Sequence, residues 1–123
     1  NNSGSGGGIG GEDGGSYLAK GTLIDGNLGV AGATDCDATV VSLGHNFIGN
    51  PTGCATFDHP SDDGGTPALL GPLADNGGRT LTMKPAAGSP VIDAGGNDCP
   101  PADQRGRPRP RGEACDVGAV EAR

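Results

Sequence analysis

Residues 69–121 read LLGPLADNGGRTLTMKPAAGSPVIDAGGNDCPPADQRGRPRPRGEACDVGAVE, and this stretch carries the most specific information in the chain. Glycines and prolines separate its short apolar segments, and Cys99 and Cys115 flank a run in which Arg alternates with Gly and Pro. Proline blocks a helix interior, so four prolines exclude a helix near the end: Pro100, Pro101, Pro108 and Pro110. We therefore expect short strands joined by turns, at 80–84, 91–95 and 117–120.

Large apolar residues are scarce in the whole chain. The 123 residues include 26 glycines and 10 prolines, but only 20 Leu, Ile, Val and Phe together. Such a composition favours disorder unless something else holds the chain together. Four cysteines in a small, core-poor chain favour disulfides and an oxidising compartment. Of the three possible connectivities we favour Cys36–Cys54 and Cys99–Cys115, since each closes a loop rich in Gly or Pro.

Residues 17–68 contain β-prone segments that repeat weakly. TLIDGN at 22–27 and NFIGN at 46–50 recur at an offset of 23–24 residues, and both end in Gly-Asn. Asn and Gly tolerate the left-handed backbone needed at a sharp corner. An offset of this length fits one coil of a β-helix, which buries only a narrow column of small aliphatic side chains. Residues 1–16, rich in Gly and Ser, are either a flexible linker or the edge of a first coil.

Four pieces of the opening stretch carry a family resemblance: LGPLADNGG at 70–78, GSPVIDAG at 88–95, DQRG at 103–106 and CDVGAVE at 115–121. They resemble the carboxyl-terminal block of bacterial cell-surface proteins called choice-of-anchor Q domain proteins. The resemblance implies a right-handed parallel β-helix, secretion and a structural or adhesive role. We accordingly predict an all-β chain stabilised by disulfides, with coils and disulfide-tied loops at 17–68 and carboxyl-terminal coils with a loop-rich cap at 69–123.

The polar residues near the end indicate a closing device. Asp93 lies between Ile92 and Ala94, so we expect its carboxylate to be partly buried and to need a partner. Arg105 is the natural candidate, because its guanidinium can bridge two acceptors. Further acceptors are Asp103, Asp116 and Glu121. We favour an Asp/Arg network closing the end of the solenoid over independent surface charges, and expect Arg107, Arg109 and Arg111 to form an extended, solvated ribbon.

Catalysis deserves consideration, because the β-helix also hosts pectate-lyase-like enzymes. Asp35 and Asp37 flank Cys36, and they would need a third ligand or a nearby base to hold calcium or act as a general acid. A solvated loop beside a disulfide is the favoured interpretation. Lys20 is the only base in residues 1–78, which leaves a lyase short of a proton acceptor.

Metal binding has similarly weak support, and we predict no cofactor. Asp58, Asp62 and Asp63 are weak candidates for a calcium site, although a turn-forming or solvated role is favoured. His45 and His59 lack the H-x-H or H-E-x-x-H spacing of a transition-metal site, so we interpret them as structural or surface residues.

Charge and aromatic content restrict the partners. The net charge of the chain is −7, and the negative charge is concentrated in residues 1–78, which hold nine acids and one base and would repel nucleic acid and anionic lipid. One Tyr, two Phe and no Trp offer no platform for stacking bases. No apolar run reaches the length of a membrane span. Since the sequence starts at Asn1 and ends at Arg123 without a sorting segment, we expect a mature or truncated product.

The leading hypothesis is a non-enzymatic, secreted or cell-surface domain, adhesin-like, at the end of a β-helical surface or fibre protein. Its expected partners are upstream coils or further copies of itself, which would stack into filaments, and extracellular glycans. One alternative is a polysaccharide lyase or hydrolase with active coils upstream or in residues 17–65. The other is a calcium- or carbohydrate-binding module.

Overall fold

The computed structural model describes residues 8–10, 16–29 and 35–123. Within them the chain is all-β, as predicted, and none of these segments forms a helix that could cross a membrane. The predicted linker or coil edge at 1–16 lies outside the described residues except at 8–10 and Ser16. The strands are β1 (Ile9–Gly10), β2 (Ser16–Ala19), β3 (Leu23–Ile24), β4 (Cys36–Ser42), β5 (Phe47–Ile48), β6 (Cys54–Ala55) and β7 (Asp63–Gly64).

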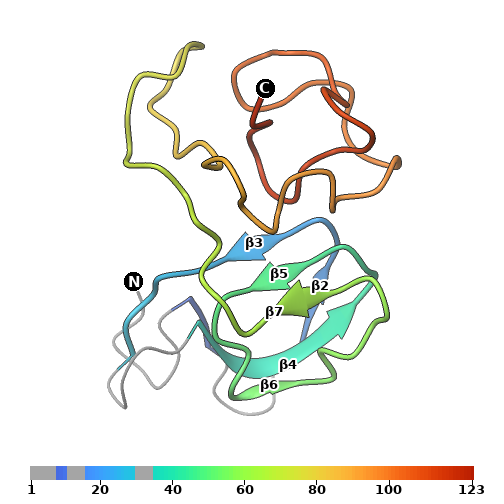
Figure 1. Ribbon diagram of the computed structural model, residues 1–123. Helices are drawn as coiled ribbons and strands as arrows, with labels where there is room; N and C mark the ends of the chain where they lie inside the picture. The colour runs from blue at the N-terminus through green and yellow to red at the C-terminus, as the bar shows by residue number, and fades with distance from the viewer. Residues whose placement is uncertain (1–7, 11–15, 30–34) are drawn as a thin grey trace. The chain divides into compact units, whose positions relative to one another are not determined.

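The chain forms two compact units, Asn1–Pro67 and Ala68–Arg123, and all seven strands belong to the first (Figure 1). β4 is the central strand of one sheet in this unit, where β1, β2 and β6 all pair with it in parallel. Ser16 lies opposite Thr39, and Ala38 lies opposite Cys54, so the steps between neighbouring strands β2, β4 and β6 are 23 and 16 residues.

The second sheet of this unit has the order β3-β5-β7 and is also parallel. Leu23 lies opposite Phe47, and Phe47 lies opposite Asp63, which gives steps of 24 and 16 residues. The two sheets therefore advance together, because each turn of chain adds one strand to each sheet, in the order β2–β3, β4–β5 and β6–β7. The weak repeat of TLIDGN and NFIGN corresponds to the pairing of β3 with β5.

A narrow column of side chains forms the core of the first unit. Its buried members are Ala19, Cys36, Val40 and Ile48, with Ile24, Cys54 and Phe57 packed against them. In β4 the buried positions Cys36 and Val40 face this column, and the disulfide between Cys36 and Cys54 links β4 to β6. This pairing is the one favoured from the sequence. It ties two adjacent turns where few large side chains are available to hold them.

Asn46 provides the polar counterpart of this column. Its side chain is buried, with Oδ1 accepting from Thr22 N at 3.0 Å and Nδ2 donating to Ala19 O at 3.0 Å and to Asp62 Oδ1 at 3.1 Å. These partners belong to the turns before and after its own. One asparagine side chain therefore makes hydrogen bonds with backbone groups of the neighbouring turns. It replaces the water molecules that these groups lose when the chain folds.

The second unit, Ala68–Arg123, contains turns and three isolated antiparallel bridges, Leu70 with Pro85, Ala74 with Thr82 and Ala102 with Pro108. The strands predicted at 80–84, 91–95 and 117–120 are therefore wrong. Asp93 has a φ of 56°, which turns the chain within the apolar segment and prevents an extended strand. The disulfide between Cys99 and Cys115, also the pairing favoured from the sequence, lies in this unit.

Candidate functional site

The second unit is organised around a buried ion pair between Asp103 and Arg105. Arg105 donates to Asp103 Oδ2 from Nη2 at 2.7 Å and from Nε at 2.9 Å, and the side chains of Arg105 and Asp103 are 1% and 0% exposed. Arg105 Nη2 also donates to the backbone oxygen of Glu121 at 2.6 Å. The guanidinium thus joins the turn at 103–105 to the last residues of the chain, in the two-pronged geometry that favours arginine over lysine.

A second ion pair lies beside the first. Arg109 Nε donates to Glu121 Oε1 at 2.6 Å, and its other nitrogens donate to the backbone oxygens of Asp116 and Gly118 at 2.5 and 3.2 Å. Both side chains are nearly buried. The expectation that Arg109 belongs to a solvated ribbon is therefore wrong. Arg109 belongs to a run in which Arg alternates with Gly and Pro. That local pattern is the same for a buried and an exposed arginine, so the sequence did not indicate that Arg109 is buried.

Five hydrogen bonds converge on the Asp103 carboxylate. Besides the two from the Arg105 side chain, the backbone N–H groups of Arg105 and Arg107 donate to Oδ1 and that of Glu121 donates to Oδ2. Burial by itself raises the pKa of Asp103, but the Arg105 guanidinium and these three N–H groups outweigh it and lower the pKa from 3.8 to about 2. The carboxylate is ionised and fully used as an acceptor, which suits a structural role.

Asp93 and Asp116 form a separate part of the same unit. Asp116 accepts from Asp93 N at 2.8 Å and from Ala122 N at 2.5 Å, and Asp93 accepts from Ala114 N at 3.2 Å. The sequence suggested Arg105 as the partner of Asp93, whereas the structure brings Arg105 to Asp103. The Asp93 carboxylate lies beside the backbone at 112–114, where the N–H of Ala114 takes the place of the arginine.

In the first unit, Asp35 is buried and serves as a backbone clamp. Its Oδ1 accepts from Asn27 N at 2.9 Å and from Asn27 Nδ2 at 3.1 Å, and its Oδ2 accepts from Asn50 N at 2.8 Å. Asp37 is half-buried in β4. The Asp35 carboxylate thus holds loops that leave two consecutive turns, which is a structural use of a residue considered for catalysis.

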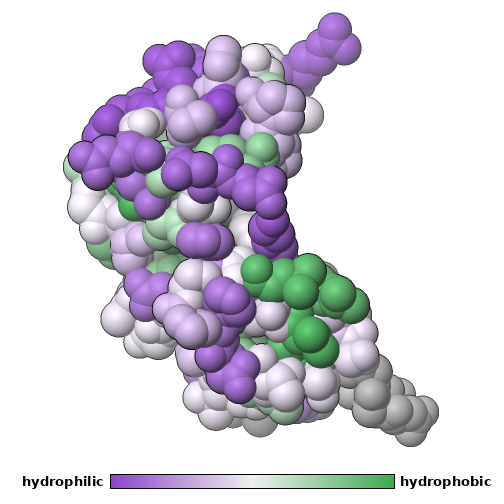
Figure 2. Space-filling model, turned by 90° about the vertical axis from the view of Figure 1, so that its right-hand side faces the viewer, coloured by the Kyte–Doolittle hydropathy of each residue, from purple (hydrophilic) through white to green (hydrophobic). Residues whose placement is uncertain are grey.

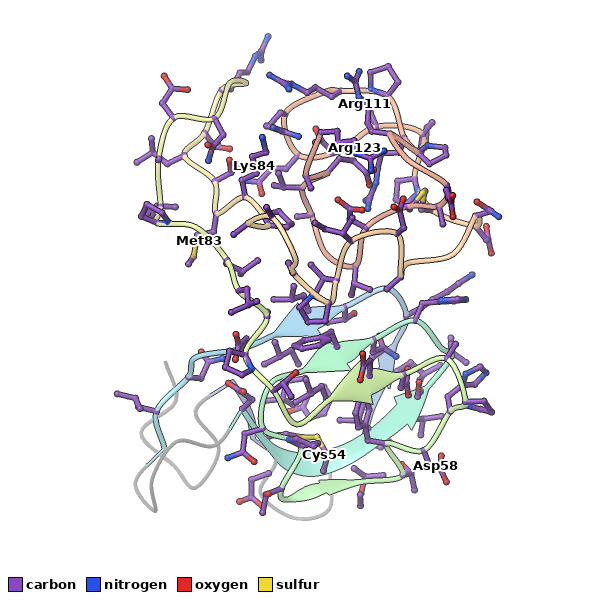
Figure 3. The ribbon with its side chains drawn as sticks, in the orientation of Figure 1. Cys54, Asp58, Met83, Lys84, Arg111 and Arg123 are labelled. Carbon is purple, nitrogen blue, oxygen red and sulfur yellow. A yellow bond between two sulfur atoms is a disulfide. The ribbon has the colours of Figure 1, made fainter. Side chains whose placement is uncertain are left out.

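The weak calcium candidates lie in different settings. Asp62 Oδ1 accepts from Asn46 N and Nδ2, while its buried Oδ2 has no hydrogen-bond partner. Asp63 accepts from the N–H of Gly64 at 2.8 Å, and Asp58 is exposed, as Figure 3 shows. Across residues 8–10, 16–29 and 35–123, no three His, Cys, Asp or Glu side chains gather closely enough to hold a metal ion.

The two histidines lie in two contacting loops, His45 between β4 and β5 and His59 between β6 and β7. His59 Nδ1 lies 2.8 Å from Ser61 Oγ, and Ser61 Oγ accepts from His45 N at 3.0 Å. His45 has a φ of 58°, so this contact supports a left-handed corner. The arrangement is a turn stabilised by side chains.

Exposed apolar side chains form a further surface feature, one that the sequence did not single out. Leu18 of β2 and Val41 of β4 are register partners and are 73% and 42% exposed, and Leu43 just after β4 is 51% exposed. Figure 2 shows hydrophobic side chains gathered into a patch on the surface. Such patches are typical of surfaces that contact another protein.

Comparison with known proteins identifies no relative. No protein-family model, curated protein or solved structure matches this chain. The resemblance to choice-of-anchor Q domain proteins therefore stays a prediction.

Proposed function

We propose that this chain is a non-enzymatic structural domain of an extracellular protein, and that its first unit is a short piece of a right-handed parallel β-helix. One observation carries the proposal. Two parallel sheets advance together, with steps of 23–24 residues and then 16 residues in both. A chain that winds repeatedly through the same two sheets produces this common spacing, whereas independent hairpins would produce antiparallel pairs.

The location follows from the cysteines. Two disulfides indicate an oxidising, extracellular environment, since cytosolic thiols are kept reduced. Placement on a bacterial cell surface is part of the proposal and draws on the family resemblance of residues 69–121. In this proposal the second unit is a separate, loop-rich element, held together by buried arginines and carboxylates in place of a large apolar core.

Assembly is the second part of the proposal. Among the described residues of the first unit, β2 and β3 have strand partners on one side only, as do β6 and β7. Unpaired edges readily add further strands. We propose that upstream coils or another copy of the chain extend the stack, and that the exposed Leu18 and Val41 favour such association.

Enzymatic activity and self-association can be tested with the same preparation. The full chain should show no turnover of uronic acid polymers or neutral polysaccharides, and sedimentation velocity should show oligomers growing with concentration. Turnover that Asp35→Asn abolishes and Asp37→Asn preserves would refute the non-enzymatic role in favour of a lyase or hydrolase. A single monomer species at millimolar concentration would refute self-association. Thermal stabilisation by calcium would instead support the calcium-binding alternative.

A further inference from the structure

We infer that the second unit binds an acidic saccharide in a concavity between Lys84 and Arg123. The concavity has a volume of about 650 Å³, within the range of about 300–1,000 Å³ that is usual for ligand sites. Of its eight lining residues, Lys84 and Arg123 are the only charged ones, and both are cations. Figure 3 shows their side chains on the carboxyl-terminal unit.

The two cations differ from the buried arginines of the same unit. Arg105 and Arg109 make ion pairs and backbone contacts with their guanidinium groups. Within the described part of the chain, the Lys84 ammonium and the Arg123 guanidinium have no hydrogen bond or ion pair. Lys84 is half-buried, and a partly desolvated charge without a counterion is stabilised by an incoming anion.

A third cation extends the positive surface. Arg111 and Arg123 both line a recess that shares Ile92 with the concavity and is too narrow to admit a water molecule. The acids in that recess are already occupied. Asp116 and Asp93 accept from backbone N–H groups, and Glu121 pairs with Arg109. Arg111 therefore adds positive charge beside the concavity without offering a second hollow, and a ligand seated in the concavity is favoured by negative charge.

The rest of the lining indicates what the anion belongs to. Pro85, Ala87 and Ile92 give the concavity an apolar floor, while the Ser89 hydroxyl is already donated to Ala68 O. A sugar ring that bears a carboxylate has an apolar face for this floor and an anionic group for the cations. A nucleotide is less suitable, because the second unit contains no aromatic residue on which a base could stack. The choice of a saccharide rests on the proposed extracellular role.

Calorimetric titration of the full chain with trigalacturonic acid tests the inference. Binding should occur at low salt and weaken as salt rises, and the neutral trisaccharide of the same linkage should not bind. Lys84→Gln and Arg123→Gln should each weaken binding about tenfold, the size expected for loss of one charge-assisted hydrogen bond. Arg123 is exposed, so its variant keeps the fold even if Lys84→Gln does not.

Arg79→Gln is the matched control, because Arg79 is an exposed cation of the same unit that does not line the concavity. It should bind like the original chain. Equal weakening by Arg79→Gln, equal binding of the neutral sugar, or no binding of trigalacturonic acid would overturn the inference. Tighter binding of a sulfated trisaccharide would overturn the choice of a carboxylate. These outcomes differ from those of the turnover and sedimentation tests, so the two proposals fail separately.

Discussion

Replacement of Asp103 with Asn should destabilise the second unit far more than the same change at the surface. Five donors converge on the two carboxylate oxygens. An amide keeps one oxygen and turns the other position into a donor, so at least two of these donors would face an N–H group. The Arg105 guanidinium, 1% exposed, would then remain buried without an anion.

The loss of stability in Asp103→Asn has a lower and an upper estimate. One pKa unit corresponds to about 1.4 kcal/mol, so a pKa of about 2 in place of 3.8 means that ionisation of Asp103 stabilises the fold by about 2 kcal/mol. Removal of one partner from a buried ion pair costs about 3–5 kcal/mol. We therefore expect Asp103→Asn to lower the free energy of unfolding of this unit by about 2–5 kcal/mol.

Amide hydrogen exchange at Val117 measures this loss within the second unit. The Val117 N–H donates to Val91 O at 2.9 Å and has no direct contact with Asp103, so its exchange reports opening of the unit. It should exchange at least about 30-fold faster in Asp103→Asn, since about 1.4 kcal/mol is a factor of ten. Glu113→Gln is the control, because Glu113 is exposed, and it should change the rate less than about threefold.

The same hydrogen-exchange measurement can be made as a function of pH. The lowered pKa makes the contribution of Asp103 complete above about pH 5 and causes its loss as the pH falls through 3.8 towards about 2. The original chain should lose protection at Val117 in this window, and Asp103→Asn should lose less. A variant with intact disulfides that exchanges at the original rate, or that shows the same acid dependence, would refute the structural role of this carboxylate.

Two further changes test the first unit, with urea unfolding as the measurement. A Cβ on Gly64 would lie 2.1 Å from Ile48 O, so Gly64→Ala should lower the free energy of unfolding by about 3 kcal/mol or more. A Cβ on Gly65 would meet no atom. Gly65→Ala should therefore cost only about 1–2 kcal/mol, which comes from the positive φ at that position. Equal losses would contradict the close approach of β5 and β7. Asn46→Ala should cost about 3 kcal/mol, because Thr22 N loses its acceptor and Ala19 O and Asp62 each lose a donor. The exposed Asn97→Ala should cost less than about 0.5 kcal/mol. Similar midpoints for these two variants would show that Asn46 does not hold the turns together.

The residues around each cysteine and each chain corner were enough to predict part of this fold. The Gly- and Pro-rich segments between cysteines pointed to the two disulfides, and the repeated Gly-Asn corners pointed to the spacing that pairs β3 with β5. The strands expected at 80–84 and 91–95 failed for a physical reason. Alternating or β-branched residues favour extended backbone, but a strand also needs a partner, and the turn at Asp93 removes the extended path.

The candidate site was predictable in its members but not in its pairing. Asp103, Arg105, Asp116 and Glu121 were recognised as a polar group, while Arg109 was placed in solvent. An arginine can reach several carboxylates that are near it in sequence, so residue type does not select the acceptor. The Asp93 carboxylate already accepts a hydrogen bond from the N–H of Ala114, and it is the path of the chain that brings these two groups together.

The sequence by itself determined the all-β character and the spacing of the first two turns, because these depend on neighbouring residues and on loop chemistry. It favoured the two cysteine pairs among three possible connectivities, and the structure has those pairs. Only the tertiary structure decided that Asn46 bridges successive turns, that Arg105 pairs with Asp103, and that Lys84 and Arg123 share one concavity. Each of these contacts depends on how distant segments fold back on each other. The energy of a buried charge or amide is set by that environment, and no local pattern records it.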